Sequence, residues 1–104
     1  MTLRRISHAR SGDKGTTINI SLIAYDAHDY LRLVRHVTAD RVKARFAAIV
    51  GGGVVRYELP AIGALNFVLS GVDGGGVTRT LALDAHGKSL SSALLDMEIS
   101  DDEM

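Results

Sequence analysis

The residues best suited to binding chemistry lie near the start of the chain, in the segment Arg10, Ser11, Gly12, Asp13, Lys14 and Gly15. Its two glycines lie three residues apart, which lets the backbone turn tightly and expose its N–H groups. Arg10 and Lys14 add positive charge, and Asp13 can hold these cations in position. These residue types at this spacing predict a loop that binds a carboxylate or a phosphate.

A salt-bridged turn is the alternative interpretation of the same segment. In that case Asp13 pairs with Arg10 or Lys14 and does no more than hold the shape of a hairpin. The length of the segment favours the anion site, because a plain hairpin needs only a two-residue turn, whereas this chain uses six residues. Both interpretations remain open from the sequence.

Two asparagines complete the set of candidate binding residues. Asn19 lies on the polar face of the strand that is expected after the loop, and Asn66 lies within an apolar run. Burial of an amide is costly unless the amide is hydrogen-bonded, so a structural hydrogen bond is the simplest role for both.

Other motifs fail on spacing. Gly87, Lys88 and Ser89 resemble the end of a phosphate-binding loop, but Ala82 stands where that motif needs a glycine. Ser11 and Lys14 match the Ser-x-x-Lys spacing of some acyl-transfer enzymes, yet Gly12 lies between them and no helical turn is expected there. No catalytic residue is assigned.

Metal and cofactor sites are not expected either. The four histidines show no pair at helical spacing and no clustered carboxylates accompany them. The glycine triplets at 51–53 and 74–76 do not lead into helices, so we interpret them as turns rather than as phosphate cradles. The sequence therefore predicts no metal and no cofactor.

Composition narrows the function classes. The 104 residues suffice for one domain with one core, and 12 basic residues balance 12 acidic ones. Zero net charge and five aromatic residues argue against nucleic-acid binding. The longest uncharged run contains Pro60 and two glycines, so no transmembrane helix is expected, and the absence of cysteine fits a cytoplasmic protein.

The expected elements place the candidate loop at one end of a hairpin. Leu3 to His8 and Thr17 to Tyr25 are predicted strands, and Ile18, Ile20 and Leu22 alternate cleanly on one face of the second. Asp26 and Thr38 are predicted N-caps of two helices, of which the second continues to Val50 and ends at Gly51.

The second half of the chain predicts further strands and helices. Val55 to Leu59 is expected to be a strand reached by a right-handed crossover, and Ala64 to Leu69 a short helix. A strand from Val77 to Leu83 and a helix from Leu90 to Met97, capped by Ser89, follow. The pattern is an α+β fold with an open mixed sheet and helices on one face.

The apolar positions of these elements predict the core and leave one sheet face uncovered. The residues expected to be buried are Ile20, Leu22, Val42, Phe46, Tyr57, Leu81, Leu83, Leu90 and Leu94. The other face, with Ile23 and Tyr25, is expected to be covered by a second copy or by a partner.

Several segments resemble the small AtuA-like domain. They are His8 to Gly15 with Asn19 and Ile20, Arg56 to Pro60, Ala64 to Phe67, and Asp84 with Gly87 and Lys88. The domain is found at the C-terminus of acyclic terpene utilisation proteins and also as a free-standing chain. The resemblance implies a ferredoxin-like sandwich and a role in the breakdown of branched, terpenoid-type acids as acyl thioesters. It implies no catalytic residue, and the larger N-terminal domain of fused relatives is not represented in these residues.

Three functions follow as expectations. The first is an accessory subunit that docks on a large AtuA-like chain and holds a carboxylate or acyl-CoA through the loop. The second is a small hydratase or isomerase that uses Lys14, Asp13 or His8 in acid-base chemistry. The third is a purely structural homo-oligomer. Few candidate bases and no paired carboxylates favour the first.

Overall fold

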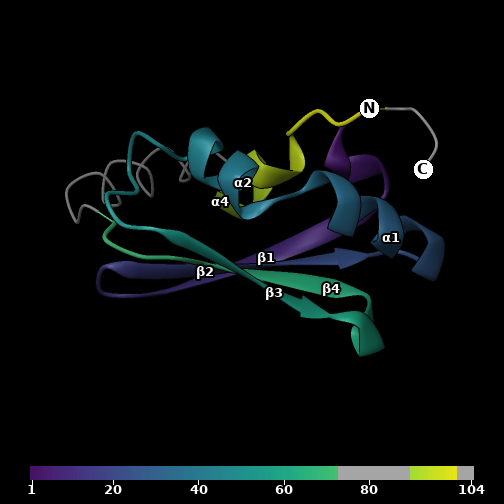
Figure 1. Ribbon diagram of the computed structural model, residues 1–104, viewed down its shortest axis with the longest axis horizontal. Coiled ribbons are helices and arrows are strands. Elements are labelled where there is room, and N and C mark those ends of the chain that lie inside the picture. The colour runs from purple at the N-terminus through teal and green to yellow at the C-terminus, as the bar shows by residue number, and fades with distance from the viewer. Residues whose placement is uncertain (73–89, 101–104) are drawn as a thin grey trace.

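Four antiparallel strands form one sheet, and the helices cover one face of it (Figure 1). The structure is a computed structural model that describes residues 1–72 and 90–100. The elements are η1 (Leu3–Arg5), β1 (Ser7–Lys14), β2 (Thr17–Ala24), α1 (Ala27–His36), α2 (Ala39–Arg45), β3 (Val54–Leu59), η2 (Pro60–Ile62), β4 (Ala64–Leu69) and α4 (Leu90–Leu95). The predicted strand from Val77 to Leu83 and the Ser89 cap lie outside the described residues.

The opening hairpin is shifted from its predicted position. The predicted strand from Leu3 begins instead as a 3-10 helix, and β1 continues through Lys14. Only Gly15 and Thr16 remain for the turn, and Gly15 has φ of 64°. A glycine at the first of two central positions is typical of a type II′ turn, which suits the twist of two paired strands. The six-residue polar loop was therefore a wrong prediction.

The strand order is β1-β2-β4-β3, and every neighbouring pair is antiparallel. Among the described strands the sheet is antiparallel rather than mixed, and β2 and β3 run parallel to each other on either side of β4. The predicted helix at Ala64 to Leu69 is the strand β4. Its alternate residues Leu65, Phe67 and Leu69 are fully buried, because β4 has a strand on each side and helices over one face.

The helix starts were predicted correctly. The Asp26 side chain accepts a hydrogen bond from the Asp29 N–H at 3.0 Å, and the Thr38 hydroxyl accepts one from the Arg41 N–H at 3.1 Å. However, α2 ends at Arg45 rather than near Gly51, and Gly51 does not adopt the left-handed conformation.

The glycine triplet at 51–53 forms part of a β-bulge before β3. Between the Val50–Val72 bridge and the Val54–Leu69 pair, three residues on one strand oppose two on the other. The Gly52 N–H donates to the Ser70 carbonyl at 3.0 Å, and a Cβ at Gly52 would lie 2.7 Å from that oxygen. The close approach of two backbones therefore requires glycine here.

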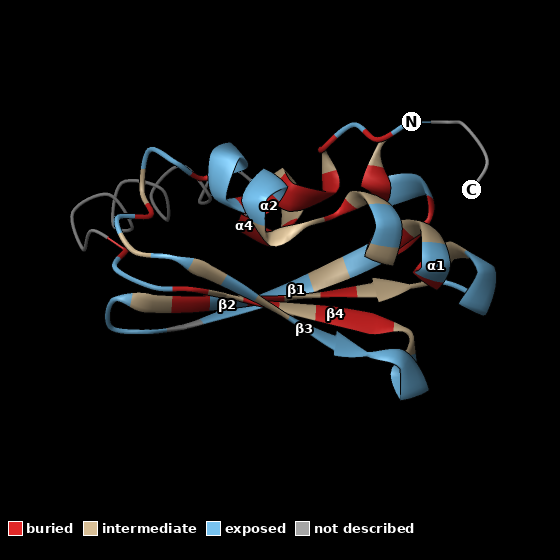
Figure 2. Cartoon of the chain, viewed as in Figure 1, coloured by how far each residue is buried: buried red, intermediate tan, exposed pale blue. Residues whose placement is uncertain are grey.

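The core lies between the sheet and the helices (Figure 2). The predicted burial is confirmed for Ile20, Leu22, Val42, Phe46, Leu90 and Leu94, while Leu81 and Leu83 lie outside the described residues. Tyr57 is the exception, with 53% of its surface exposed. The prediction chose the wrong face of β3, because Val54 and Arg56 face the helices and Tyr57 faces away.

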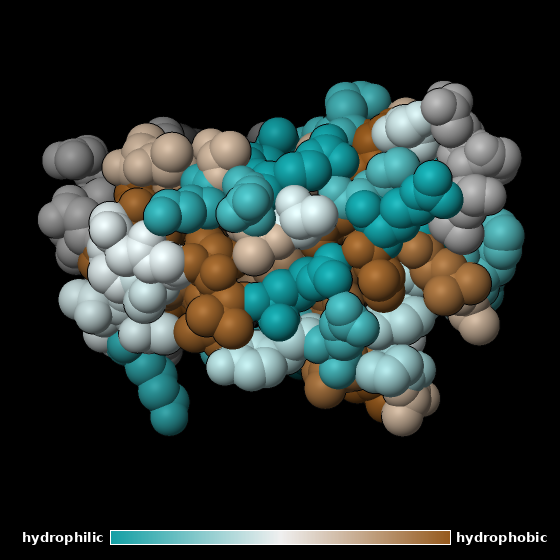
Figure 3. Space-filling model, viewed as in Figure 1, coloured by the Kyte–Doolittle hydropathy of each residue, from teal (hydrophilic) through white to brown (hydrophobic). Residues whose placement is uncertain are grey.

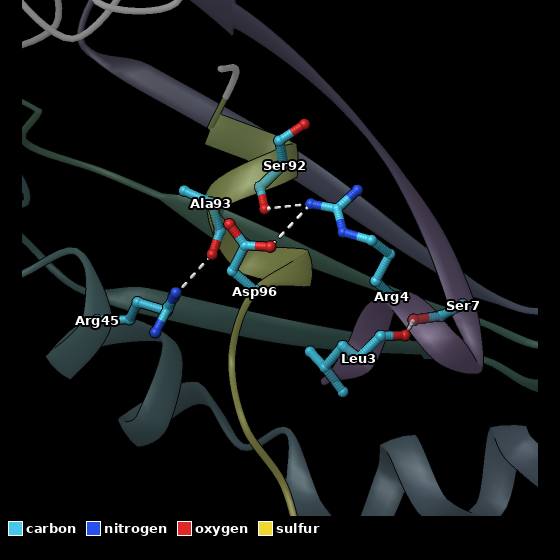
Figure 4. A network of polar contacts seen from close by, with 7 residues as sticks. All are labelled: Leu3, Arg4, Ser7, Arg45, Ser92, Ala93 and Asp96. Atoms are coloured by element: carbon cyan, nitrogen blue, oxygen red, sulfur yellow. Dashed lines mark hydrogen bonds and ion pairs between the residues drawn. The ribbon is translucent and has the colours of Figure 1, made fainter. Parts of the chain in front are cut away.

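Polar contacts fix α4 beside the start of β1 (Figure 4). The Arg4 guanidinium donates to Asp96 Oδ1 at 2.9 Å and to the Ser92 carbonyl at 3.3 Å. From α2, Arg45 Nε donates to the Ala93 carbonyl at 2.8 Å. These contacts join the C-terminal helix α4 to η1 and to α2.

Candidate functional site

The face of the sheet that points away from the helices, called here the open face, gathers several predicted site residues. Directly paired residues of antiparallel strands share a face, so the register defines its rows. One row crosses all four strands and consists of Arg10, Ser21, Asn66 and Tyr57. The next row consists of Gly12, Asn19, Val68 and Val55.

Burial on the other face determines this arrangement. Ile18, Ile20 and Leu22 of β2 are buried under the helices, so the residues between them must point outward. Asn19 is accordingly exposed on the open face. A one-residue change of register would move these side chains to opposite faces, which is why the apolar pattern also positions the polar groups.

Strand β1 gives the open face a column of basic side chains. Arg10 and Lys14 lie four residues apart on the same side of this strand, and both are exposed. Neither has a hydrogen bond or ion pair within the described part of the chain. His8, two positions before Arg10, stacks on Tyr25 with ring centroids 5.5 Å apart and planes inclined by 25°. The open face thus carries two cations that lack a partner among the described side chains, of which Asp13 is not one.

Gly12 lies between the two cations on the same face and has no side chain to fill the space between them. It pairs with Asn19, and a Cβ at Gly12 would make only ordinary contact with Asn19 Nδ2, at 3.9 Å. The absence of a side chain leaves room for ligand atoms beside the Asn19 amide. An anion at this position would meet donors of both kinds, charged and neutral.

Asn66 has the structural hydrogen bond that its sequence context predicted. Its Nδ2 donates to the Ser21 hydroxyl at 2.8 Å across β2 and β4. This bond holds the middle of the Arg10 row in a fixed geometry. The corresponding prediction for Asn19 is untested, since no hydrogen bond is described for its side chain.

The remaining predicted site residues lie apart from this row. Ser11 pairs with Ile20 and so belongs to the opposite face, and Gly15 lies in the turn. The backbone of Asp13 pairs with Ile18, and its side chain is outside the description. A cradle of successive outward N–H groups is therefore not formed, because alternate groups of β1 are directed to β2.

The open face also carries an apolar strip that the sequence did not assign to it. On β3, Val55, Tyr57 and Leu59 are 50%, 53% and 40% exposed. A hollow of about 320 Å³ adjoins one end of this face, with Tyr25, Tyr30 and Ile62 among its lining residues. Ser21 was missed as the neighbour of Arg10, because the sequence placed Arg10 in a loop rather than in the strand that pairs with β2. Tyr57 was missed as a member of the row, because its place follows from the pairing with β4, where a helix was predicted.

The described residues contain no group of three or more histidine, aspartate or glutamate side chains placed to hold a metal ion. Within the same ranges, no helix has the length and apolar character needed to cross a membrane. The groups that Arg10, Lys14, Asn19, Asn66 and Ser21 place on the open face are cations, amides and a hydroxyl, which suit the binding of an anion.

Comparison with known proteins found no similar curated protein and no similar solved structure. Comparison with protein families matched residues 1–100 to the AtuA ferredoxin-like domain. The match spans both strands of the hairpin, the crossover helices, β3, β4 and α4, and agrees with the α+β architecture of an open antiparallel sheet. The chain belongs to the AtuA ferredoxin-like domain family.

Proposed function

We propose that this chain is an accessory binding subunit that presents an anion site on its open face and docks on a large AtuA-like chain. The observation that carries the proposal is the pair of exposed cations, Arg10 and Lys14, which have no partner among the described side chains and lie on a sheet face that the described helices leave uncovered. The ligand is a carboxylic acid or its acyl-CoA thioester, in the breakdown of branched or terpenoid-type acids.

The spacing of the cations favours the larger ligand. Arg10 and Lys14 are four residues apart on one strand, which corresponds to about 14 Å at a rise of about 3.4 Å per residue. A simple carboxylate meets one of them, whereas the phosphates of an acyl-CoA are far enough apart to meet both. We therefore expect acyl-CoA to bind more tightly than the free acid.

The apolar strip supports the docking part of the proposal. Val55, Tyr57 and Leu59 lie along β3 on the open face, where Tyr57 ends the row of Arg10, Ser21 and Asn66. Tyr25 and Ile62 are exposed at one end of this face. Apolar side chains that flank a polar centre are typical of protein interfaces. A large chain that covers this face would exclude water from the Arg10 row and so strengthen its contacts with an anion.

Titration of an acyl-CoA thioester and of a free carboxylate into wild type and Lys14→Ala tests the anion site. Loss of one charge-assisted contact should weaken acyl-CoA binding by about 1.5–3 kcal/mol, or roughly one to two decades in affinity. The melting temperature should stay unchanged, because an exposed lysine contributes little to stability.

Lys43→Ala is the matched control, since Lys43 is an exposed lysine on α2, in the helical layer. It should bind as wild type does. Equal affinities for wild type and Lys14→Ala would remove the anion site from the proposal. Co-purification from the native host tests the subunit role, and isolation of the chain without any larger AtuA-like chain would contradict that role.

A further inference from the structure

Strand β3 ends the sheet and presents one edge without a neighbour among the described residues. The strand order places it beside β4 alone. In Figure 1 it crosses in front of the other strands, and Figure 3 shows hydrophilic and hydrophobic groups side by side on this side of the molecule. Unpaired backbone groups on such an edge are a template for another strand.

The hydrogen-bond ladder between β3 and β4 shows which residues of β3 face this edge. The Ser70 N–H donates to the Gly53 carbonyl at 3.0 Å, and in antiparallel pairs such bonding alternates along the strand. Gly53, Val55, Tyr57 and Leu59 therefore direct backbone groups to β4. Val54, Arg56 and Glu58 direct theirs away from the sheet. The hydrogen bond from the Ala24 N–H to the Gly63 carbonyl, at 2.9 Å, gives the same alternation. It implies that Leu65, Phe67 and Leu69 direct their backbone groups to β2, so the residues between them direct theirs to β3.

The side chains of β3 are complementary to a second copy of the same strand in one register. With a two-fold axis at Tyr57, Arg56 faces Glu58 of the second copy, Val55 faces Leu59, and Tyr57 faces itself. Because of the two-fold axis, the charge pair and the apolar pair each occur twice in the dimer. An axis at Arg56 would instead place two guanidinium groups opposite each other.

The other end of the sheet does not offer this complementarity. The open-face column of β1 consists of His8, Arg10, Gly12 and Lys14, with no acidic position among them. Pairing of β1 with its own copy brings these cations together. Charge thus favours self-association at β3.

We propose that two copies of the chain pair through their β3 edges, antiparallel and centred on Tyr57, to form one continuous sheet. Arg56 already contacts its own Glu58 at 2.9 Å, and in the dimer it lies between that carboxylate and Glu58 of the second copy. The exposed surfaces of Val55, Tyr57 and Leu59 become partly covered. The two open faces join into one, and this inference does not depend on the anion site.

A single introduced cysteine tests both the dimer and its register, since the natural chain has no cysteine. Tyr57 is a position that does not hydrogen-bond across the new interface, where Cα atoms are about 4.5 Å apart, within the range that a disulfide spans. Tyr57→Cys should therefore form a covalent dimer under mild oxidation. Val55→Cys is the control and should stay uncrosslinked, because its counterpart lies four residues along the strand.

Sedimentation equilibrium tests the charge pairing without a new bond. Wild type should dimerise, and Glu58→Lys should weaken the dimer at least about tenfold, because it sets a lysine against Arg56. Leu31→Lys removes an exposed apolar side chain of α1 and should leave the dimer intact. A monomeric wild type would overturn the proposal. Crosslinking of Val55→Cys in place of Tyr57→Cys, or an unaffected Glu58→Lys dimer, would overturn the register.

Discussion

At the scale of single residues, Tyr30 is a buried phenol whose hydroxyl has no hydrogen-bond partner in the described part of the chain. Its side chain lies on α1 and faces β3, with 8% of the residue exposed. Burial first, and then the negative charge of Glu58, raise the pKa of Tyr30 above its ordinary value of 10.0, while Arg56 acts in the opposite direction.

This raised pKa makes a prediction about stability at high pH. Above pH 10 the phenol of the unfolded chain loses its proton while that of the folded chain keeps it, so the folded state binds more protons. The free energy of unfolding should therefore be fully maintained below pH 10 and fall as pH rises through the folded pKa. Tyr30→Phe should make this decline shallower in urea unfolding series.

Tyr25→Phe is the control, because it removes the hydroxyl of an exposed tyrosine, whereas Tyr30→Phe removes that of a buried one. At neutral pH Tyr30→Phe should cost less than about 1 kcal/mol, since no bond to the hydroxyl is lost. A larger loss would show that the hydroxyl has a partner that these contacts do not include.

At the scale of elements, the bulge between β3 and β4 depends on glycines. Gly71 has φ of 64°, and a Cβ there would lie 2.5 Å from the Gly52 nitrogen. Gly71→Ala should therefore destabilise the protein by about 2–4 kcal/mol, from the strained conformation together with the backbone clash. Gly53→Ala is the control, since a Cβ at Gly53 meets nothing within 4 Å. Denaturant unfolding that ranks the two variants equally would contradict the role of the bulge.

The element scale is also where sequence reasoning succeeded and failed most clearly. The caps Asp26 and Thr38 were predictable, because capping needs only a side-chain oxygen and a nearby N–H. The clean alternation of Ile18, Ile20 and Leu22 likewise identified β2. In these cases the structure is determined by residues close together in the sequence, and packing in the folded chain does not override it.

Residues whose state depends on distant partners were not predictable in the same way. Leu65 and Phe67 fit helix and strand equally well over so short a run, and only the neighbours β2 and β3 make β4 a strand. Tyr57 was placed on the buried face because it shares the apolar side of its strand with Val55 and Leu59. In fact Arg56 donates to the carbonyls of Val34 and Val37 at 2.8 and 3.1 Å, so a buried-side arginine caps the end of α1.

The candidate site shows the same division. The residue types of Arg10 and Lys14 predicted an affinity for anions from the sequence alone, and this affinity stays a prediction. Their geometry was wrong, because the hairpin turn needs only Gly15 and Thr16 and the rest of the segment joins the sheet. The row that links Arg10 to Asn66 depends on how β1, β2 and β4 pair. The apolar periodicity within a single strand does not predict that pairing.

At the scale of the whole molecule, the sheet has one covered face and one open face, and its strands differ in how they are held. β4 is bonded on both sides, while β3 is the last strand of the order. Leu65, Phe67 and Leu69 are fully buried, so β4 is also covered by the core along its length. Stability should therefore decrease from the centre of the sheet toward β3.

Amide hydrogen exchange measures this gradient, and we expect β4 to exchange most slowly. The N–H groups of Leu65 and Phe67 point to β2, and that of Asn66 points to β3, so successive residues should all be protected.

In dilute protein, exchange rates along β3 should instead alternate, with slow exchange at Tyr57 and fast exchange at Arg56 and Glu58. At high concentration the two fast amides should slow if a second copy pairs with them, whereas Tyr57 should not change. Uniform protection along β3 in dilute protein would contradict its place at the end of the sheet, and fast exchange throughout β4 would contradict its place at the centre.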